Sequence, residues 1–221
     1  MAGSVDYVAN WVFAEDFLPE PDALAHARSR ARELGVPALS PATGALLEVI
    51  AASLKAASAV EIGTSAGVGI VHLLSAMPPG AIVTSVDMEA EHQHAAREAL
   101  REAGIPLSQV RLINSRPAEV LPRLADEAYD LVLLGGSKLD YMNRLADAIR
   151  LLKPGGVLAV IGALADGRVP DPARRDPVTV TVREVGKELR RRGDLTVAMS
   201  AAGDGLLLAV KRPRAPLGHT R

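Results

Sequence analysis

The chain has 221 residues, of which 48% are hydrophobic, a length that suits one sizeable core better than two ordinary domains. Its 25 basic and 26 acidic residues nearly cancel, and no basic run is long enough to follow a nucleic-acid backbone. No stretch approaches the roughly 20 apolar residues of a membrane-spanning helix. The absence of cysteine excludes disulfides, thiolate nucleophiles and cysteine-based zinc sites. These features predict a protein that binds neither nucleic acid nor a membrane.

The N-terminal segment, residues 1–20, carries four of the six aromatic residues and shows no clear helical or strand period: Tyr7, Trp11, Phe13 and Phe17. We interpret it as an arm that packs on the body or on a second subunit, and we expect a homodimer. The first ten residues lack the basic start and apolar core of a secretory signal, so cytoplasmic residence is the expectation.

Two accessory helices are predicted within residues 21–56. The first has Pro21 at its first helical position and ends at Gly35. The second has Ser40 as N-cap and Pro41 at its first position, followed by apolar residues that share one face. Both helices precede the repeating part of the chain, and all of residues 1–221 are expected to belong to one domain.

Short apolar runs then alternate with helical patterns. This order predicts a doubly wound, Rossmann-like α/β fold, in which a mostly parallel sheet has helices on both faces. After a helix over 177–191, two strands joined by five residues form an antiparallel pair, which reverses the last strand. The segment 163–176 is predicted to be a long loop over the carboxyl edge of the sheet. The predicted strands are 59–62, 82–86, 110–113, 131–134, 157–161, 195–199 and 206–210.

A glycine-rich turn follows the first of these strands and leads directly into a helix. Glycines at Gly63, Gly67 and Gly69 permit a tight turn and the close approach of a ligand to the backbone. Asp87 ends the next strand, where a carboxylate can accept hydrogen bonds from both hydroxyls of a ribose. The dinucleotide pattern G-x-G-x-x-G fails because His72 stands at its third position, which disfavours a nicotinamide-dependent oxidoreductase.

Six stretches in order resemble the class I S-adenosylmethionine-dependent O-methyltransferases related to catechol and caffeoyl-coenzyme A methyltransferases, particularly their small actinobacterial members. The resemblance covers the chain from about Leu39 to the last strand, and it implies a seven-stranded sheet with a reversed last strand. The stretches are VEIGTSAGVG (60–69), VTSVDMEAEH (83–92), VRLINSRPAEVLPRL (110–124), YDLVLLGGSKLDY (129–141), LLKPGGVLAV (151–160) and GDGLLLAVK (203–211).

This resemblance also implies where S-adenosylmethionine binds. Its methionine part is expected against the glycine turn with Glu61 beneath, its ribose on Asp87, and its adenine near Met88 and the turn 115–118. The backbone at Leu39 is a further expected contact. The complete predicted cofactor site comprises Leu39, Glu61, Gly63, Thr64, Ser65, Gly67, Gly69, Asp87, Met88, Ser115, Arg116, Pro117, Ala118 and Gly135.

Many members of that family hold a divalent cation with two aspartates and an asparagine. The motif D-A-D-K, whose first aspartate is a ligand, reads Gly135-Gly136-Ser137-Lys138 here, and the later D-N pair reads Ile161-Gly162. Divalent cations of this kind need several oxygen ligands, and Gly135, Ile161 and Gly162 offer no side-chain oxygen. The sequence therefore predicts no catalytic metal site.

Lys138 and Tyr141 keep the K-x-x-Y spacing of the family and are the predicted catalytic residues. The resemblance implies that Lys138 acts as general base, which requires a pKa lowered toward 7 or 8, from about 10.4; the alternative is a solvated lysine at a helix start. Asp140 is interpreted as an acid favoured by the helix dipole rather than a replacement ligand. His72 is expected to be a packed residue, and His92 and His94 do not face each other on a helix.

Two functions remain open. The first is an O-methyltransferase that uses S-adenosylmethionine on a small-molecule hydroxyl group without a bound cation. Its acceptor is expected at the edge formed by Lys138, Tyr141 and the loop 163–176, where Arg168 or Arg174 could meet an anionic group. The second is a catalytically degenerate protein that binds S-adenosylmethionine without transferring its methyl group.

Overall fold

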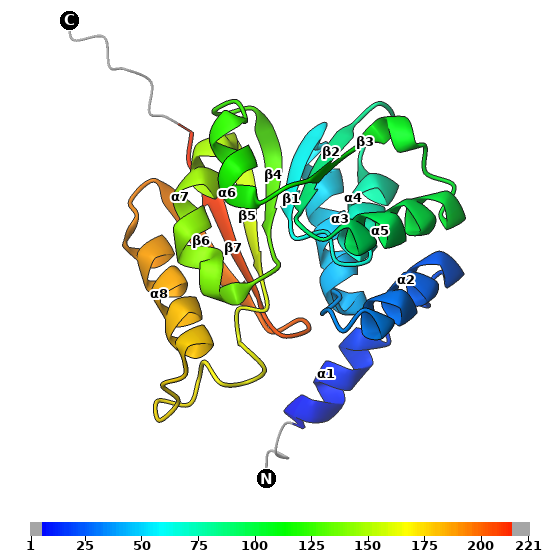
Figure 1. The fold of residues 1–221 in the computed structure, drawn as a ribbon. Coiled ribbons are helices and arrows are strands. Elements are labelled where there is room, and N and C mark those ends of the chain that lie inside the picture. The colour runs from blue at the N-terminus through cyan, green and yellow to red at the C-terminus, as the bar shows by residue number, and fades with distance from the viewer. Residues whose placement is uncertain (1–5, 214–221) are drawn as a thin grey trace, which may run out of the picture.

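The computed structural model describes residues 6–213, which form a seven-stranded sheet covered by helices (Figure 1). The strand order is β3-β2-β1-β4-β5-β7-β6, in which β7 runs antiparallel to both of its neighbours and the other pairs are parallel. The predicted doubly wound α/β fold with a reversed last strand is confirmed. The strands are β1 (Ser58–Ile62), β2 (Ile82–Asp87), β3 (Val110–Asn114), β4 (Tyr129–Leu134), β5 (Leu152–Ile161), β6 (Leu195–Ser200) and β7 (Leu206–Lys211).

Helices cover both faces of this sheet. Figure 1 shows α3, α4 and α5 on one face and α7 and α8 on the other. No helix within residues 6–213 is long and apolar enough to cross a membrane. The α-helices are α1 (Tyr7–Glu15), α2 (Asp22–Glu33), α3 (Pro41–Leu54), α4 (Val68–Ala76), α5 (Ala90–Glu102), α6 (Pro117–Val120), α7 (Tyr141–Leu151) and α8 (Pro177–Arg191), with short 3-10 turns at η1 (Leu107–Gln109), η2 (Leu121–Arg123) and η3 (Lys138–Asp140).

The central strand β4 is continuously apolar from Leu131 to Leu134 because both faces of the sheet are buried there. In β4, Leu131 and Leu133 pack with α3 and α4, whereas Val132 and Leu134 pack with α7 and α8. Successive side chains of a strand point to opposite faces, so one apolar run supplies both cores. This is why the strands could be found from short continuous apolar runs.

The N-terminal arm contains a helix that the sequence did not indicate. α1 begins after Asp6, whose side chain accepts a hydrogen bond from the backbone N–H of Ala9 at 2.9 Å. None of the side chains of α1 is buried, so no apolar stripe of helical period marks it. The lack of a clear helical period in this segment is therefore compatible with a helix. Residues 1–5 of the predicted arm, and His219, lie outside the described residues.

The two accessory helices form close to the predicted positions. Pro21 is the N-cap of α2 rather than its first helical residue, because its ψ of 145° is extended. Ser40 caps α3 as predicted: its hydroxyl accepts a hydrogen bond from the N–H of Thr43 at 3.2 Å, and Pro41 opens the helix.

The loop 163–176 lies at the carboxyl edge of the sheet and is fastened by one arginine. Arg183 of α8 donates hydrogen bonds to the carbonyl oxygens of Arg168, Val169, Asp171 and Arg174. A guanidinium offers five N–H donors in a fixed plane, which suits it to holding several carbonyl groups at once.

The packing of α3 on α4 depends on Gly44. A Cβ atom at Gly44 would lie 2.1 Å from Nε2 of His72, which is 5% exposed. The Nδ1 atom of His72 lies 2.7 Å from Oε1 of Glu48, while burial lowers the pKa of the imidazole. His72 is thus a packed residue, as predicted, and its ring needs the space that glycine leaves.

We predict that Gly44→Ala lowers the free energy of unfolding by about 1–3 kcal/mol, because the buried imidazole must shift to admit a methyl group. The matched control is Gly186→Ala in α8, where an added Cβ meets no atom within 4 Å. That change should raise stability by up to about 1 kcal/mol, since alanine is the better helix former. Urea unfolding of both variants measures the two effects, and a Gly44→Ala protein as stable as the wild type would contradict this account of the packing.

Candidate active site

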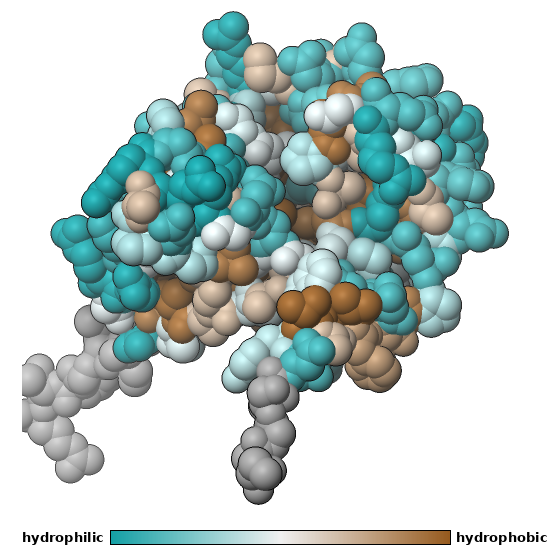
Figure 2. All heavy atoms as spheres, turned by 90° about the horizontal axis from the view of Figure 1, so that it is seen from below, coloured by the Kyte–Doolittle hydropathy of each residue, from teal (hydrophilic) through white to brown (hydrophobic). Residues whose placement is uncertain are grey.

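A cavity of 570 Å³ opens at the carboxyl ends of β1, β2, β4 and β5. Figure 2 views the molecule from this edge and shows a central hollow with apolar atoms on its inner wall. The chain leaves β1 toward β2 on one side and returns through β4 on the other, so the cavity lies where the strand order reverses. Open α/β sheets bind ligands at this point, and the volume lies within the usual range of small-molecule sites.

Close contact between two loops forms the floor of the cavity. Gly63 after β1 and Gly136 after β4 have φ angles of 90° and 72°, and a Cβ on Gly63 would lie 2.5 Å from the backbone nitrogen of Gly136. Only glycine combines this conformation with this approach. Gly67, at the start of α4, is needed for a different reason: its Cβ would lie 2.7 Å from Cα of Ala96 in α5.

Asp87 is held at the end of β2 by two backbone groups. Its Oδ2 accepts a hydrogen bond from the N–H of Thr64 at 2.8 Å, and its Oδ1 accepts one from the N–H of Glu89 at 3.0 Å. A carboxylate can accept about four hydrogen bonds, so further acceptor capacity faces the cavity. This geometry fits an acid that receives the two hydroxyls of a ribose.

Glu61 lies beneath the glycine turn and is 4% exposed. Its Oε2 accepts a hydrogen bond from the hydroxyl of Ser85 at 2.6 Å, and that hydroxyl lies 2.7 Å from Oγ1 of Thr64. Burial raises the pKa of Glu61 to about 8; Ser85 opposes the shift, and the charge of Asp87 adds to it. Without a bound cation, Glu61 is therefore mostly protonated at neutral pH, whereas a cationic ligand above it favours the carboxylate.

His92 in α5 is a site residue that the sequence reasoning missed. Its Nδ1 lies 3.1 Å from Oδ2 of Asp87 and is buried without a hydrogen bond to any described residue. The sequence analysis considered only the spacing of His92 and His94 along the helix, and this spacing says nothing about Asp87. Its distance from Asp87 depends on how α5 packs, which the sequence does not reveal.

Most of the predicted cofactor residues line the cavity, and four do not. Gly67 serves the packing of α4 on α5. Ser115 donates its hydroxyl to Glu119, Arg116 caps α6, and Ala118 lies within that helix, so none of these lines the cavity. The residues that do line it are Leu39, Glu61, Gly63, Thr64, Ser65, Gly69, Asp87, Met88, Pro117 and Gly135.

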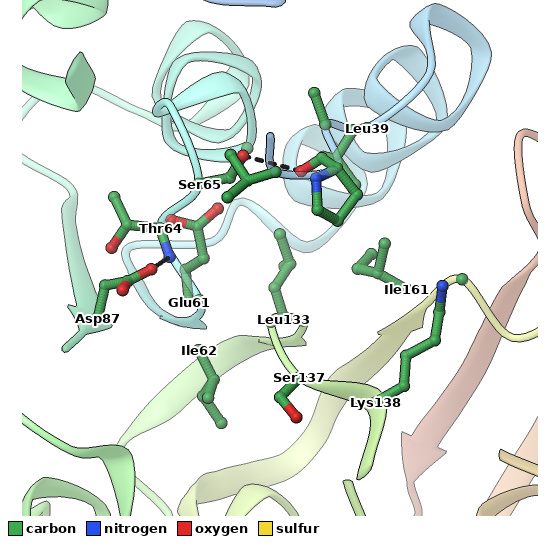
Figure 3. A pocket seen from close by; sticks show the side chains of 18 of the residues that line it. Leu39, Glu61, Ile62, Thr64, Ser65, Asp87, Leu133, Ser137, Lys138 and Ile161 are labelled. Atoms are coloured by element: carbon green, nitrogen blue, oxygen red, sulfur yellow. Dashed lines mark hydrogen bonds between the residues drawn. The ribbon is translucent and has the colours of Figure 1, made fainter. Parts of the chain in front are cut away.

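The segment before α3 forms a wall of the cavity that was predicted only at Leu39. Val36, Pro37, Ala38 and Ser40 line it as well. Figure 3 shows the hydroxyl of Ser65 directed at this segment, and it donates a hydrogen bond to the carbonyl oxygen of Pro37 at 2.8 Å. The glycine turn and the N-terminal segment are therefore joined directly.

The opposite end of the cavity carries Lys138 and Tyr141. Figure 3 places Lys138 and Ile161 at the side away from Asp87. The Nζ of Lys138 lies 3.1 Å from Oδ2 of Asp204, in the turn between β6 and β7. The hydroxyl of Tyr141 donates to the carbonyl oxygen of Ile161 at 2.9 Å, and burial raises the pKa of this phenol above its ordinary value.

A different arginine from those predicted lies at this end. Arg144 lines the cavity and pairs with Asp140 at 2.9 Å, whereas Arg168 and Arg174 are not among the lining residues. Arg168 pairs with Asp166 and Asp176, and Arg174 pairs with Asp171. Neither of the two predicted arginines therefore lies at the wall of the cavity; carboxylates and the carbonyl oxygen of Ala165 hold Arg168, and Asp171 holds Arg174.

The positions that bind a cation in relatives carry no ligand side chain here. Gly135, Ile161 and Gly162 all line the cavity. A Cβ on Gly162 would lie 2.8 Å from Nζ of Lys138, so the lysine side chain lies in the space beside this glycine. Within residues 6–213, no three histidine, aspartate or glutamate side chains converge in a way that could hold a metal ion.

Comparison with known proteins adds independent findings. The sequence model of a family described as O-methyltransferase matches residues 22–212. A Mycobacterium tuberculosis protein named a probable O-methyltransferase is 42% identical over 201 residues, which is 91% of this chain and 90% of that protein.

Two crystal structures are also similar. A protein from Corynebacterium glutamicum superimposes with a TM-score of 0.87 at 32% identity, covering 96% of this chain and 99% of the other. The O-methyltransferase TomG from Streptomyces achromogenes, involved in tomaymycin synthesis and crystallised with S-adenosylmethionine, superimposes with a TM-score of 0.81 at 27% identity, covering 95% and 100%.

We predict that Glu61 makes stability depend on pH. Because its folded-state pKa of about 8 exceeds the ordinary 4.5, the native protein binds more protons than the unfolded chain between these values. The free energy of unfolding should then fall as pH rises through this window, by at most about 1.4 kcal/mol per pH unit. Glu61→Gln should remove this dependence. Parallel urea titrations of both proteins measure it, and identical pH profiles would show that Glu61 is ionised in the folded state.

Proposed function

Because the chain belongs to the class I S-adenosylmethionine-dependent O-methyltransferases, we propose that it methylates a hydroxyl group of a small molecule without using a divalent cation. The observation that carries this proposal is the cavity itself. One end has the acid and backbone groups that suit a nucleoside, and the other has a charged pair beside apolar walls. S-adenosylmethionine supplies an electrophilic methyl group on a sulfonium when it is bound.

The residues present fit this cofactor. Asp87 would hold the ribose, and the glycine turn leaves its backbone open to the methionine part. Glu61 lies beneath that turn, where a carboxylate would face the positive charges of the cofactor. His92, whose Nδ1 has no hydrogen bond among the described residues, is a further polar group beside the ribose-binding acid.

Metal independence is supported by the lining of the acceptor end. Magnesium and calcium ions are held by several oxygen ligands, and Gly135, Ile161 and Gly162 offer no side-chain oxygen to such an ion. Methyl transfer depends mainly on aligning an acceptor oxygen with a methyl group that is already activated. Positioning alone can therefore supply much of the acceleration.

The same three residues favour one alternative, a catalytically degenerate protein that binds S-adenosylmethionine. Both proposals require cofactor binding, and they differ only in turnover. Incubation with S-adenosylmethionine and a panel of phenols, catechols and their thioester derivatives distinguishes them, because only the enzyme forms methylated product. Lys138 and Tyr141 remain the predicted catalytic residues for the first proposal.

We predict that S-adenosylmethionine binds the metal-free protein and that Asp87→Ala weakens binding by about 1–3 kcal/mol, since two ribose hydroxyls lose their acceptor. Isothermal titration calorimetry in the presence of a chelator measures both affinities. The control is Asp194→Asn, which removes a carboxylate from an ion pair with Arg192 at a distant surface. Equal affinities in the Asp87→Ala and wild-type proteins would remove Asp87 from the cofactor site.

We further propose that the protein forms a homodimer through α1. A monomer seldom exposes a large contiguous apolar patch, and a second copy would cover this one. Figure 2 shows apolar atoms gathered beside the N-terminal end of the chain. The exposed apolar side chains of this segment are Tyr7, Val8, Trp11, Val12, Phe13, Phe17 and Leu18.

We predict that replacing Trp11, Phe13 and Phe17 together by serine converts the dimer into monomers, because three exposed rings leave the proposed contact. Light scattering during gel filtration measures the mass. Leu107→Ser is the matched control, since Leu107 is 52% exposed in η1, far along the chain from α1. A triple variant that stays dimeric would exclude α1 as the essential contact, and a wild-type monomer would exclude the dimer.

A further inference from the structure

The turn between β6 and β7 brings a carboxylate to the acceptor end of the cavity. Asp204 and Lys138 are 66 positions apart in the sequence, yet their side chains meet at 3.1 Å. Both line the cavity, with 29% and 20% of their side chains exposed. The pair is therefore partly shielded from water but still open to a ligand.

Four backbone hydrogen bonds fix the position of Asp204. Its Oδ1 accepts the N–H of Asp166 at 2.6 Å, and its carbonyl oxygen accepts the N–H of Leu164 at 2.8 Å. The N–H of Gly205 donates to the carbonyl of Ala202, and the carbonyl oxygen of Gly205 accepts the N–H of Ala163. These bonds hold the turn against the loop 163–176 and leave Oδ2 directed at Lys138.

Glu15 holds the same turn from its other side. One oxygen, Oε1, accepts the N–H of Gly203 at 2.7 Å and the hydroxyl of Ser40 at 3.1 Å, and Oε2 accepts the N–H of Ala42 at 3.2 Å. A Cβ on Gly203 would lie 2.6 Å from Oγ1 of Thr43, so the turn and α3 are in close contact. The carboxylate of Asp204 is thus placed by α1, α3 and the loop together.

The contacts of Lys138 suit a positively charged ammonium group. Its side chain lies over Gly162, and its Nζ donates to Asp204. An ammonium group has three N–H donors and no acceptor, and one of its donors here is directed at a carboxylate oxygen. Two of its donors remain for a ligand. Lys138 is therefore better suited to binding an oxygen than to removing a proton from it.

The other ionisable groups at this end are committed elsewhere. Tyr141 donates its hydroxyl to the carbonyl oxygen of Ile161, Asp140 pairs with Arg144, and Asp166 pairs with Arg168. Glu61 and Asp87 belong to the half of the cavity that fits the nucleoside. Asp204 is the carboxylate that lies beside both a cation and the apolar wall formed by Ile161.

We propose that Asp204 is the proton acceptor of the methyl transfer and that the ammonium of Lys138 holds the acceptor oxygen, an inference that rests on the proposed function. The hydroxyl group donates to Oδ2 of Asp204 and accepts from Nζ of Lys138. As the new O–CH₃ bond forms, the S–CH₃ bond breaks and its electron pair stays on sulfur. The hydroxyl becomes more acidic as this bond forms, its proton passes to Oδ2 and then to water, and Lys138 keeps its protons.

The experiment compares Asp204→Asn, Asp204→Glu and Lys138→Met with the wild type. Each protein is loaded with isotopically labelled S-adenosylmethionine and mixed with catechol or phenol, and the single-turnover rate of methyl transfer is measured. Asparagine can still accept the N–H of Asp166, so Asp204→Asn should preserve the turn while it removes the proton acceptor and the negative charge beside Lys138. Its rate should fall by about 10²–10⁴, the usual contribution of a general base, with cofactor affinity unchanged.

The remaining variants distinguish a role of Asp204 and Lys138 in methyl transfer from a role in the folding of the turn. Asp204→Glu should retain more activity than Asp204→Asn because it keeps a carboxylate. Lys138→Met should raise the KM for the acceptor as well as lower the rate, and Asp194→Asn should leave both unchanged. An Asp204→Asn protein as fast as the wild type would overturn the proposal.

Three further results also count against the proposal, and they differ in meaning. A wild-type protein that binds S-adenosylmethionine but methylates neither catechol nor phenol would overturn the role of Asp204 and leave the cofactor site intact. A protein that does not bind S-adenosylmethionine would instead overturn the proposed function. A loss of cofactor affinity in Asp204→Asn equal to its loss of rate would show that Asp204 acts only on the structure of the cavity.

Discussion

The site depends on the close approach of the loops that follow β1 and β4. An ideal Cβ on Gly63 would lie 2.5 Å from the backbone of Gly136, so any side chain at Gly63 would separate the two strand ends. This contact lies at the reversal of strand order, where the helices that follow β1 and β4 pack on opposite faces. The cavity forms between the loops that lead to these helices, while β1 and β4 remain paired in the sheet. Asp87 and Lys138 can therefore line one cavity although they follow different strands.

The two ends of this cavity handle charge in different ways. At the nucleoside end, burial raises the pKa of Glu61 to about 8 while backbone N–H groups hold Asp87. Glu61 can thus be protonated while it lies near the carboxylate of Asp87. A cationic ligand would favour the ionised form of Glu61. At the acceptor end, each charged group that lines the cavity is paired with one of opposite sign: Lys138 with Asp204, Arg144 with Asp140, and Asp166 with Arg168. A neutral hydroxyl group that enters this end therefore meets an ion pair, Lys138 and Asp204, rather than unpaired charges of one sign.

The sequence predicted the parts of the structure that local pattern controls. Apolar runs located the strands, Ser40 and Pro41 located the start of α3, and the glycine turn with Asp87 located one side of the cavity. Contacts between distant segments were not predictable in this way: Asp204 meets Lys138 across 66 positions, and His92 reaches Asp87 only through the packing of α5. α1 was missed for a related reason, because a helix that buries no side chain leaves no apolar period in the sequence. Arg168 and Arg174 were expected near the acceptor, but they pair with aspartates within residues 166–176. The sequence shows that a residue is charged, but it does not show which residue of opposite charge will pair with it.

The hydrogen bond from Gly203 to Glu15 joins residues 188 positions apart, and this separation has a consequence for biosynthesis. Synthesis proceeds from the N-terminus, so α1, the glycine turn and most of the sheet emerge from the ribosome before the turn that carries Asp204. The acceptor end therefore receives Asp204 only after the rest of the cavity has been synthesised, when β6 and β7 add to the edge of the sheet beside β5.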